Sequence, residues 1–311
     1  MSISSSKYKF VQLKEGRAGV TTETKHAPLS SVAASPLANP RATRAALECH
    51  GLVAKHRLGQ NFLVDDSVVR RILQLAELSK ADTVLEVGPG MGTLTCALLP
   101  RAEKVIAVEA DHTLEAVLAE TCAQASDHLE ILWGDALKVL PTGLGEAQPT
   151  QLVSNLPYQV AATLILKVLS ELPSIKRVVV MVQAEVADRI AAVPGNKNYG
   201  AYTAKLGLYA EVTGRFEVSH ACFMPAPHVE SAVVRIDRRP LKQGCDPVFV
   251  SQVIDAAFAQ RRKTIRNSMA ASGFDKTALD TAFKQANIQA TCRAEMLAVE
   301  DFIQLARALE S

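Results

Sequence analysis

The segment Asn155-Leu156-Pro157-Tyr158 follows a predicted buried strand, Gln151 to Ser154. Open α/β sheets bind their ligands at the carboxyl ends of strands, so these residues stand where a ligand would bind. The Asn155 side-chain oxygen and the Leu156 carbonyl could accept hydrogen bonds from both hydrogens of an exocyclic amine. Pro157 stiffens the turn, and Tyr158 offers a face on which a base can stack.

This pattern suits methylation of the N6 amine of adenine. The lone pair of that amine is delocalised into the ring, and two acceptors can draw the nitrogen toward tetrahedral geometry. No general base is obviously required, because a methyl sulfonium donor is already activated. Positioning and electrostatics should therefore do most of the work.

A glycine turn lies between another predicted strand, Thr83 to Val87, and a helix. Gly88 and Gly90 allow the backbone to bend sharply and to approach a ligand closely. Glu109 ends the next predicted strand, where a carboxylate can accept hydrogen bonds from both ribose hydroxyls of an adenosine ligand. The dinucleotide fingerprint needs a glycine at position 93, which is Thr93 here. The turn therefore favours S-adenosylmethionine over NAD.

Asp135 and Ala136 follow a third predicted strand, Leu129 to Trp133. The Asp135 carboxylate could bind the exocyclic amine of the cofactor's adenine, with the Ala136 backbone amide nearby. The alternative is that Asp135 only caps a helix.

Strands alternate with helices from Ala38 to about Ile236, which predicts an α/β fold with a mostly parallel, Rossmann-like sheet. Two later runs, 211–218 and 231–236, are expected to form an antiparallel edge pair. Asp65 and Asp66 are candidate N-caps of a helix. These elements would place both motifs at one edge of the sheet.

The predicted organisation has three parts. Residues 1–37 lack periodicity and are expected to form a disordered tail, with a transit peptide as the less favoured alternative. Residues 38–243 are expected to form a class I S-adenosylmethionine methyltransferase domain. Residues 244–311 carry helical periodicity and are expected to form a small all-helical domain.

The bulk composition excludes several classes of protein. The chain has 311 residues and a formal charge of +2, so a nucleic-acid surface must come from local clusters of cations. No apolar run is long enough to span a membrane. The six cysteines form no Cys-x-x-Cys pair, so we expect reduced thiols in a cytoplasmic protein and no metal site.

Together these segments resemble the ribosomal RNA adenine dimethylases, specifically the bacterial KsgA type, over residues from about 40 to 310. The segment 58–63 is similar to the family's N-terminal cofactor motif, which implies that Gln60, Asn61 and the Leu63 backbone close over the methionine part of the cofactor. The segment 223–231 resembles the family's proline-rich loop, which implies that Phe223 forms the second wall of the adenine pocket.

The resemblance implies dimethylation of two adjacent adenosines in a hairpin near the 3′ end of small-subunit (16S) ribosomal RNA. The substrate would be that RNA or a pre-30S particle. The pocket must then accept an amine that already carries one methyl group. A monomer is the default expectation.

Two basic clusters are candidate RNA-binding surfaces, and a solvated charged face is the alternative for each. The segment 260–267 resembles a basic segment of the family's C-terminal domain, and on a helix Arg262 and Arg266 would share a face. The second cluster is Lys55-His56-Arg57, of which we single out Lys55 and Arg57. The cations of the first cluster are Arg261, Arg262, Lys263 and Arg266.

Four other functions fit parts of the sequence. A resistance methylase acting on large-subunit RNA is the nearest, and the match along the whole length argues against it. A DNA adenine methylase would usually carry Pro-Pro after the Asn or Asp. A noncatalytic assembly or transcription factor is disfavoured by the intact motifs, and a NAD-dependent dehydrogenase by the glycine turn.

Overall fold

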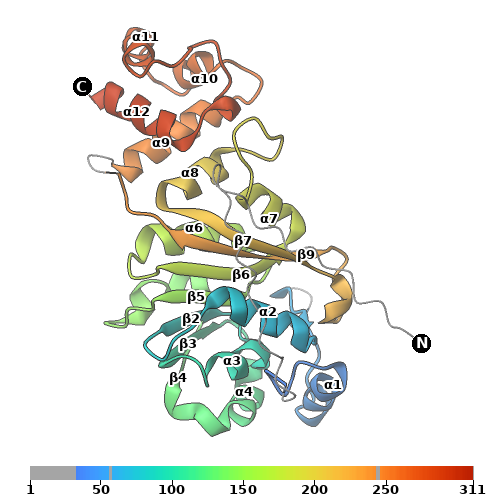
Figure 1. Cartoon of the computed structure of the whole chain (residues 1–311). Coiled ribbons are helices and arrows are strands. Elements are labelled where there is room, and N and C mark those ends of the chain that lie inside the picture. Colours follow the sequence, from blue (N-terminus) through green and yellow to red (C-terminus); the bar gives the residue numbers. More distant parts are fainter. Residues whose placement is uncertain (1–32, 56–57, 243–245, 311) are drawn as a thin grey trace, which may run out of the picture. The chain divides into compact units, whose positions relative to one another are not determined.

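The computed structural model describes residues 33–55, 58–242 and 246–310 (Figure 1). By their internal contacts these residues form two compact units. The first, here called the α/β unit, comprises the described residues up to Ala184 together with Val212–Asp237. The second, here called the helical unit, comprises Glu185–Glu211 and the described residues from Arg238 onward.

The helical unit takes in a segment that sequence periodicity assigns to the methyltransferase domain. Residues 185–211 leave the sheet, form two helices and return. Tyr199 in this segment donates a hydrogen bond from its hydroxyl to the Leu297 carbonyl at 2.9 Å, and its ring lies 6.1 Å from that of Phe258. These interactions, rather than position along the chain, give residues 185–211 to the helical unit. The boundary at residue 243 remains a proposal for where the C-terminal domain begins.

A seven-stranded sheet runs through the α/β unit in the order β4-β3-β2-β5-β6-β9-β7 (Figure 1). Strands β2 to β6 pair in parallel, and β9 pairs antiparallel with β6. The expected mostly parallel sheet is confirmed, and the two late strands lie side by side at one edge. The bounds are β2 Thr83–Val87, β3 Lys104–Glu109, β4 Leu129–Trp133, β5 Gln151–Asn155, β6 Arg177–Gln183, β7 Ala210–Val218 and β9 Ser231–Arg238.

A small second sheet pairs β1 (Phe62–Leu63) antiparallel with β8 (Phe223–Met224). In the chain, β1 precedes every strand of the large sheet, and β8 lies between β7 and β9.

The first six helices among the described residues are α1 Pro40–Cys49, α2 Asp66–Ala76, α3 Thr93–Leu98, α4 Glu115–Thr121, α5 Ala136–Val139 and α6 Ala161–Glu171. The remaining helices are α7 Ala184–Ile190, α8 Ala201–Tyr209, α9 Pro247–Phe258, α10 Ile265–Ala271, α11 Lys276–Gln285 and α12 Val299–Glu310.

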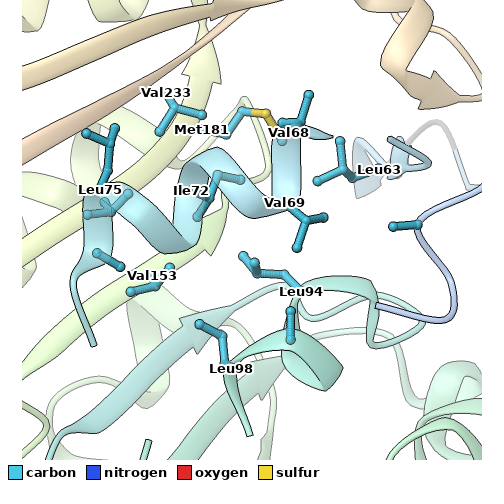
Figure 2. Packing of buried hydrophobic residues seen from close by; sticks show 14 of the residues in the cluster. Leu63, Val68, Val69, Ile72, Leu75, Leu94, Leu98, Val153, Met181 and Val233 are labelled. Carbon is cyan, nitrogen blue, oxygen red and sulfur yellow. The ribbon is translucent and has the colours of Figure 1, made fainter. Parts of the chain in front are cut away.

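Helix α2 packs one apolar face into the core of the α/β unit. Its N-cap is Asp65, whose carboxylate accepts from the Ser67 amide at 2.9 Å, as the sequence indicated. Figure 2 shows Val68 beside Met181 and Val233 of the sheet. The buried positions of α2 are Val68, Val69, Ile72, Leu75 and Ala76. Their i, i+3, i+4 spacing is what the periodicity predicted.

The other candidate cap, Asp66, has a different role. It lies inside α2, pairs with Arg70 and accepts a hydrogen bond from the Ala34 amide at 2.6 Å. Leu37 is buried in a cluster with Leu114 and Leu118. Ser35 and Leu37 are therefore buried, which corrects the prediction that a disordered tail extends to residue 37. The rest of that prediction, residues 1–32, lies outside the described residues.

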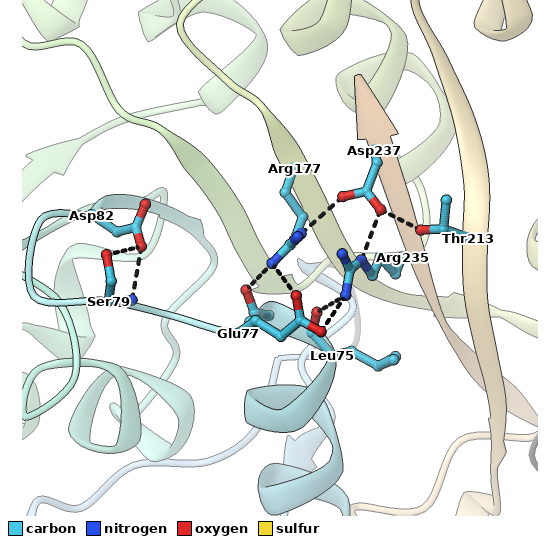
Figure 3. A network of polar contacts seen from close by, with 9 residues as sticks. Leu75, Glu77, Ser79, Asp82, Arg177, Thr213, Arg235 and Asp237 are labelled. Atoms are coloured by element: carbon cyan, nitrogen blue, oxygen red, sulfur yellow. Dashed lines mark hydrogen bonds and ion pairs between the residues drawn. The ribbon is translucent and has the colours of Figure 1, made fainter. Parts of the chain in front are cut away.

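The C-terminal end of α2 is fixed to the sheet by a network of charges (Figure 3). Glu77 contacts Arg177 at 3.1 Å and Arg235 at 3.0 Å, and both arginines bond Asp237 at 2.8 Å. Arg177 is the first residue of β6, so this network lies at the end of the sheet opposite the carboxyl ends of its parallel strands. The network therefore anchors α2 at a distance from the carboxyl ends of the strands.

Strands β2 and β5 part toward their carboxyl ends. They pair at Val84–Gln151 and Leu85–Leu152. Beyond those pairs the Ser154 side chain bridges the gap: its hydroxyl accepts from the Val87 amide at 3.3 Å and donates to the Val87 carbonyl. From β2 the chain proceeds to β3 on one side, and from β5 to β6 on the other, so a crevice opens at this reversal of strand order.

We predict that Ser154→Ala lowers the free energy of unfolding by about 1–3 kcal/mol, because both backbone groups of Val87 lose a buried partner. Ser170→Ala, at an exposed position of α6, is the matched control and should change stability by no more than about 0.5 kcal/mol. Urea unfolding followed by circular dichroism measures both. Equal losses for the two variants would show that Ser154 does not carry the link between the strands.

Candidate active site

A cavity of about 360 Å³ lies in the α/β unit at the carboxyl ends of β2, β3 and β5. Its volume falls in the range of small-molecule sites, which is roughly 300–1,000 Å³. Five stretches of chain that are far apart in sequence supply most of its wall. They are residues 58–63, 86–90, 108–110, 134–136 and 155–160.

The cavity brings together every residue that the sequence singled out for the cofactor, and most of those singled out for the adenine. The first group consists of Gln60, Asn61, Leu63, Gly88, Gly90, Glu109, Asp135, Ala136 and Asn155. The second consists of Leu156, Pro157 and Tyr158. The roles of these residues stay predictions, but all of them line the same cavity.

The glycine turn contacts both neighbouring walls of the cavity. Gly88 has φ +74° and Gly90 φ +61°, conformations that favour glycine. A Cβ on Gly88 would lie 3.3 Å from the Pro157 ring, and one on Gly90 would lie 3.3 Å from the Phe62 ring. Side chains at these positions would press on those two rings and would strain the backbone, so the turn requires glycine at both.

Glu109 is 7% exposed at the end of β3. One carboxylate oxygen accepts from the Asp111 amide at 2.8 Å and the other from the Gly90 amide at 3.2 Å. Burial raises the pKa of Glu109, and these hydrogen bonds partly oppose that shift. A carboxylate oxygen can accept more than one hydrogen bond, so both can still receive a ribose hydroxyl. The buried acceptor and the open glycine turn fit the adenosine part of S-adenosylmethionine.

Asp135 is exposed and caps α5, accepting from the Leu137 amide at 3.0 Å. The interpretation that Asp135 caps a helix is therefore confirmed. The residue also lines the cavity, so its second carboxylate oxygen remains available for an exocyclic amine. Cap and ligand contact are compatible at this position.

The Asn155 amide is oriented by its neighbours. Its side-chain nitrogen donates to the Asn61 carbonyl at 3.3 Å, which leaves the side-chain oxygen as the acceptor. The next residue, Leu156, donates its backbone amide to the Met181 carbonyl at 3.1 Å and buries its side chain. Two adjacent strands thus fix the backbone from which the two predicted acceptors project.

Tyr158 is half-buried, and its hydroxyl lies 2.7 Å from the hydroxyl of Ser231. Ser231 is fully buried at the start of β9. Burial raises the pKa of Tyr158, so the phenol is neutral at physiological pH. Sequence reasoning assigned Ser231 no role of its own, although it ends the proline-rich loop.

Phe223 is not among the residues that line this cavity, and its place as the second wall of the adenine pocket stays a prediction. It is 4% exposed and belongs to the core cluster that contains Leu63. Strand β8, where Phe223 lies opposite Leu63, pairs with β1, and this pairing takes the ring into the core. The resemblance located the loop but could not show which way its aromatic ring points.

Lys55 is partly exposed and pairs within the α/β unit, and its contact with RNA stays a prediction. Its ammonium donates to the Asp111 carboxylate and to the Thr113 hydroxyl, both at 2.7 Å. The other member of that predicted cluster, Arg57, lies outside the described residues. Asp111 is buried, and sequence reasoning missed it, although its position after Glu109 could have drawn attention to it.

The C-terminal basic cluster is not one helical face. The segment 261–263 is a turn between α9 and α10, with Thr264 as the N-cap of α10. Arg266 bonds Asp280 through two nitrogens, and Arg261 contacts Glu295 at 3.2 Å. Arg262 and Lys263 are exposed, and no ion pair within the described residues involves either. The prediction that Arg262 and Arg266 share a face is wrong, because the helix begins between them.

Glu86 is a buried carboxyl below the glycine turn that sequence reasoning passed over. It is 1% exposed and accepts a hydrogen bond from the Thr95 hydroxyl at 2.7 Å. Burial raises the pKa of Glu86 to about 8, and the nearby Glu109 charge adds to that shift. The group is therefore mostly neutral at pH 7.

Two other kinds of site have no candidate within the described ranges. No group of three or more His, Cys, Asp or Glu side chains in these ranges could hold a metal ion. None of the helices they form has the length and apolar character needed to cross a membrane.

Comparisons with known proteins point to one family. The family model for ribosomal RNA adenine dimethylase matches residues 51–311. A ribosomal RNA small subunit methyltransferase A from Thermobifida fusca is 43% identical over 263 residues, 82% of this chain and 90% of the relative. A dimethyladenosine transferase from Plasmodium falciparum has a TM-score of 0.69 at 26% identity, over 78% of this chain and 95% of that one. The 23S rRNA methyltransferase ErmE has a TM-score of 0.61 at 26% identity, over 81% and 100%.

We predict that Glu86→Gln flattens the dependence of stability on pH. The ordinary pKa of the carboxyl is 4.5, and in the folded protein it is raised to about 8. The stability that the neutral carboxyl contributes is fully present below pH 4.5 and is lost as pH rises through 8, because the unfolded chain releases the proton first. Above that pH the variant should be more stable than the unmodified protein by an amount on the order of a few kcal/mol.

Urea unfolding at a series of pH values between 5 and 9 measures this difference, with Glu103→Gln at an exposed position as the control. Parallel curves for the Glu86→Gln variant and the unmodified protein would contradict the assignment of Glu86 as a neutral buried acid.

Proposed function

The chain belongs to the ribosomal RNA adenine dimethylase family, and from that premise we propose that it dimethylates the N6 amines of two adjacent adenosines near the 3′ end of small-subunit ribosomal RNA. It is an adenine N6,N6-dimethyltransferase that uses S-adenosylmethionine and has the class I methyltransferase fold. The observation that carries the proposal is that the Asn155–Tyr158 segment and the glycine turn line one cavity. The proposed substrate is the RNA or a pre-30S particle, and the proposed setting is the cytoplasm.

The α/β unit supplies three contacts for the cofactor. Glu109 would accept hydrogen bonds from the ribose hydroxyls, and Asp135 would accept one from the adenine amine. The backbone of the glycine turn would lie against the ligand. When bound, S-adenosylmethionine supplies a methyl group on a positively charged sulfur, which needs no further activation. The task left to the protein is to hold the target nitrogen in line with that methyl group.

The adenine amine would be held by two acceptors. The Asn155 side-chain oxygen is free to accept because the nitrogen of the same amide bonds Asn61. The Leu156 carbonyl is the second acceptor, held by the bond of its own amide to Met181. When the S–CH3 bond of the cofactor breaks and the methyl group passes to the nitrogen, the nitrogen would gain positive charge, which both oxygens would stabilise until the nitrogen releases a proton to solvent.

Tyr158 would stack on the flipped base from one side. Its hydroxyl bond to Ser231 sets the ring orientation. Phe223 is the proposed opposite wall. A second transfer to the same nitrogen requires that the pocket also accept the methyl group already added.

The likeness to a 23S rRNA methyltransferase favours one rival, a large-subunit target. Labelled S-adenosylmethionine should be offered separately to small subunits lacking the modification, to their naked RNA and to large subunits, and the labelled nucleotides mapped. The proposal expects N6,N6-dimethyladenosine at a pair of adjacent positions in small-subunit RNA. Label confined to large-subunit RNA would establish the rival.

We predict that Tyr158→Ala lowers kcat/KM for RNA roughly 5- to 150-fold, which corresponds to about 1–3 kcal/mol of base stacking. Tyr158→Phe keeps the ring and loses only the Ser231 bond, so its loss should be several-fold smaller. Calorimetric affinity for S-adenosylmethionine should stay within about threefold of the unmodified value in both. If cofactor affinity fell as much as activity, Tyr158 would belong to the cofactor site instead.

We also predict that replacing Arg262 and Lys263 together by Ala weakens RNA binding and lowers its salt dependence. The slope of log K against log salt should fall by about 0.7–0.9 for each phosphate that the variant no longer neutralises. Arg266→Ala is the matched control, because Asp280 already holds that guanidinium. Filter binding between 50 and 300 mM salt measures both. A larger change for Arg266→Ala would place the RNA-binding surface on α10 and not on the turn.

A further inference from the structure

Asp111 lies just outside the cavity, two residues beyond Glu109. It is 5% exposed and is not among the cavity-lining residues. Its backbone amide donates to a Glu109 carboxylate oxygen at 2.8 Å. The residue therefore contacts the predicted ribose acceptor from outside the lining of the cavity.

Both oxygens of the Asp111 carboxylate are occupied. One accepts from the Lys55 ammonium and the Thr113 hydroxyl, each at 2.7 Å, and the other accepts from the Gln60 side-chain nitrogen at 2.8 Å. The Gln60 oxygen in turn accepts from the Lys55 amide at 2.9 Å. Lys55, Gln60 and Asp111 thus form a closed ring of hydrogen bonds.

This ring joins two walls of the cavity that come from distant parts of the chain. Gln60 lies in the wall 58–63, and Glu109 lies in the wall 108–110. The wall 58–63 is also attached elsewhere: Asn61 accepts from the Asn155 side chain, the Phe62 ring lies against Gly90, and Phe62–Leu63 pairs with β8. The carboxylate of Asp111 is the attachment that reaches the ribose side.

The ring of hydrogen bonds also places a cation beside a group of buried acids. Glu109 and Asp111 are acids buried beside one another, and Glu86 is a third acid nearby. The like charge of Asp111 adds to the burial that raises the pKa of Glu109. Burial alone would raise the pKa of Asp111 too, but the bonds from Lys55, Thr113 and Gln60 outweigh it and hold that pKa well below its usual range. The Lys55 ammonium pairs with Asp111 at 2.7 Å, so it offsets the like charge that Asp111 presents to Glu109.

We propose that Asp111 is a positioning residue for the cofactor site, which holds Gln60 across from Glu109 while Lys55 balances the buried negative charge. A protonated Glu109 could accept fewer hydrogen bonds from a ribose. By offsetting the charge of Asp111, Lys55 favours the ionised form of the ribose acceptor, and Asp111 holds the opposite wall through Gln60. The inference depends on the proposed use of S-adenosylmethionine. It does not depend on the proposed RNA target.

The first experiment measures calorimetric binding of S-adenosylmethionine without RNA. Asp111→Ala should raise Kd roughly 10- to 100-fold, the range expected for losing charge-assisted hydrogen bonds. At saturating cofactor, kcat on the RNA should stay within about threefold. Asp127→Asn, an exposed acid of the same unit, should leave both unchanged. An unchanged Kd for Asp111→Ala, or a loss confined to kcat, would overturn the proposal.

The second experiment uses Lys55 and does not depend on whether Asp111→Ala folds. Cofactor affinity should weaken as pH falls through the pKa of Glu109. Lys55→Met removes the balancing cation and should move the midpoint of this change to higher pH, whereas Lys55→Arg should restore it. Asp111→Asn removes a like charge and should move the midpoint to lower pH. Lys176→Met, at an exposed lysine, is the control.

General loosening of the fold would weaken binding at every pH without moving that midpoint in opposite directions. A common midpoint for Lys55→Met, Asp111→Asn and the unmodified protein would overturn the charge-balancing role. Because no RNA is present, these outcomes are independent of the substrate: failure to methylate small-subunit RNA, with the midpoints shifted as expected, would contradict the proposed function alone.

Discussion

The hydroxyl of Ser154 allows two neighbouring strands to separate without leaving buried backbone groups unpaired. After Leu85–Leu152 the ladder between β2 and β5 ends, and the amide and carbonyl of Val87 both bond this one side chain. An unpaired buried amide would cost about as much as a lost hydrogen bond, so the separation needs such a bridge. The glycine turn and the Asn155 segment then begin on the two sides of the gap.

Each wall of the cavity takes its position from this gap. Pro157 packs against Gly88, and the bond of Leu156 to Met181 continues the pairing of β5 with β6 past the end of the strand. The segment 58–63 closes a third side and is held by Asn155 and Asp111. The site is thus assembled from strand ends whose spacing the sheet fixes, which is the kind of support that precise positioning of a methyl acceptor requires.

The features that could be predicted from the sequence are those encoded locally. Apolar periodicity located the strands and α2, an acid before that helix marked its cap, and glycines with positive φ marked the turn. Helix α1 was missed although Asn39 and Pro40 form a typical N-terminus, because most of its apolar positions are alanines, which give a weak periodic signal. The resemblance to a family added the N-terminal cofactor motif, which no local pattern would have connected to the cavity.

The features that could not be predicted depend on which distant groups meet. Lys55 reads as a surface cation until the fold places it on Asp111, and Arg266 reads as an RNA contact until α11 brings Asp280 to it. The burial of Phe223 beside Leu63 likewise comes from the pairing of β8 with β1, which no local pattern shows. In each case the outcome is decided by a partner far along the chain.

The small sheet of β1 and β8 has a consequence for the order in which the protein can be made. The residues that wall the cavity all precede position 161, yet β1 needs Phe223–Met224 as its pairing partner and Tyr158 needs Ser231. Contacts of such long sequence separation form late, since the chain between them must first be closed into a loop. During synthesis, then, a nascent chain carries every predicted cofactor-binding residue well before it can hold these residues in place. The site matures only when β9 has been added to the sheet.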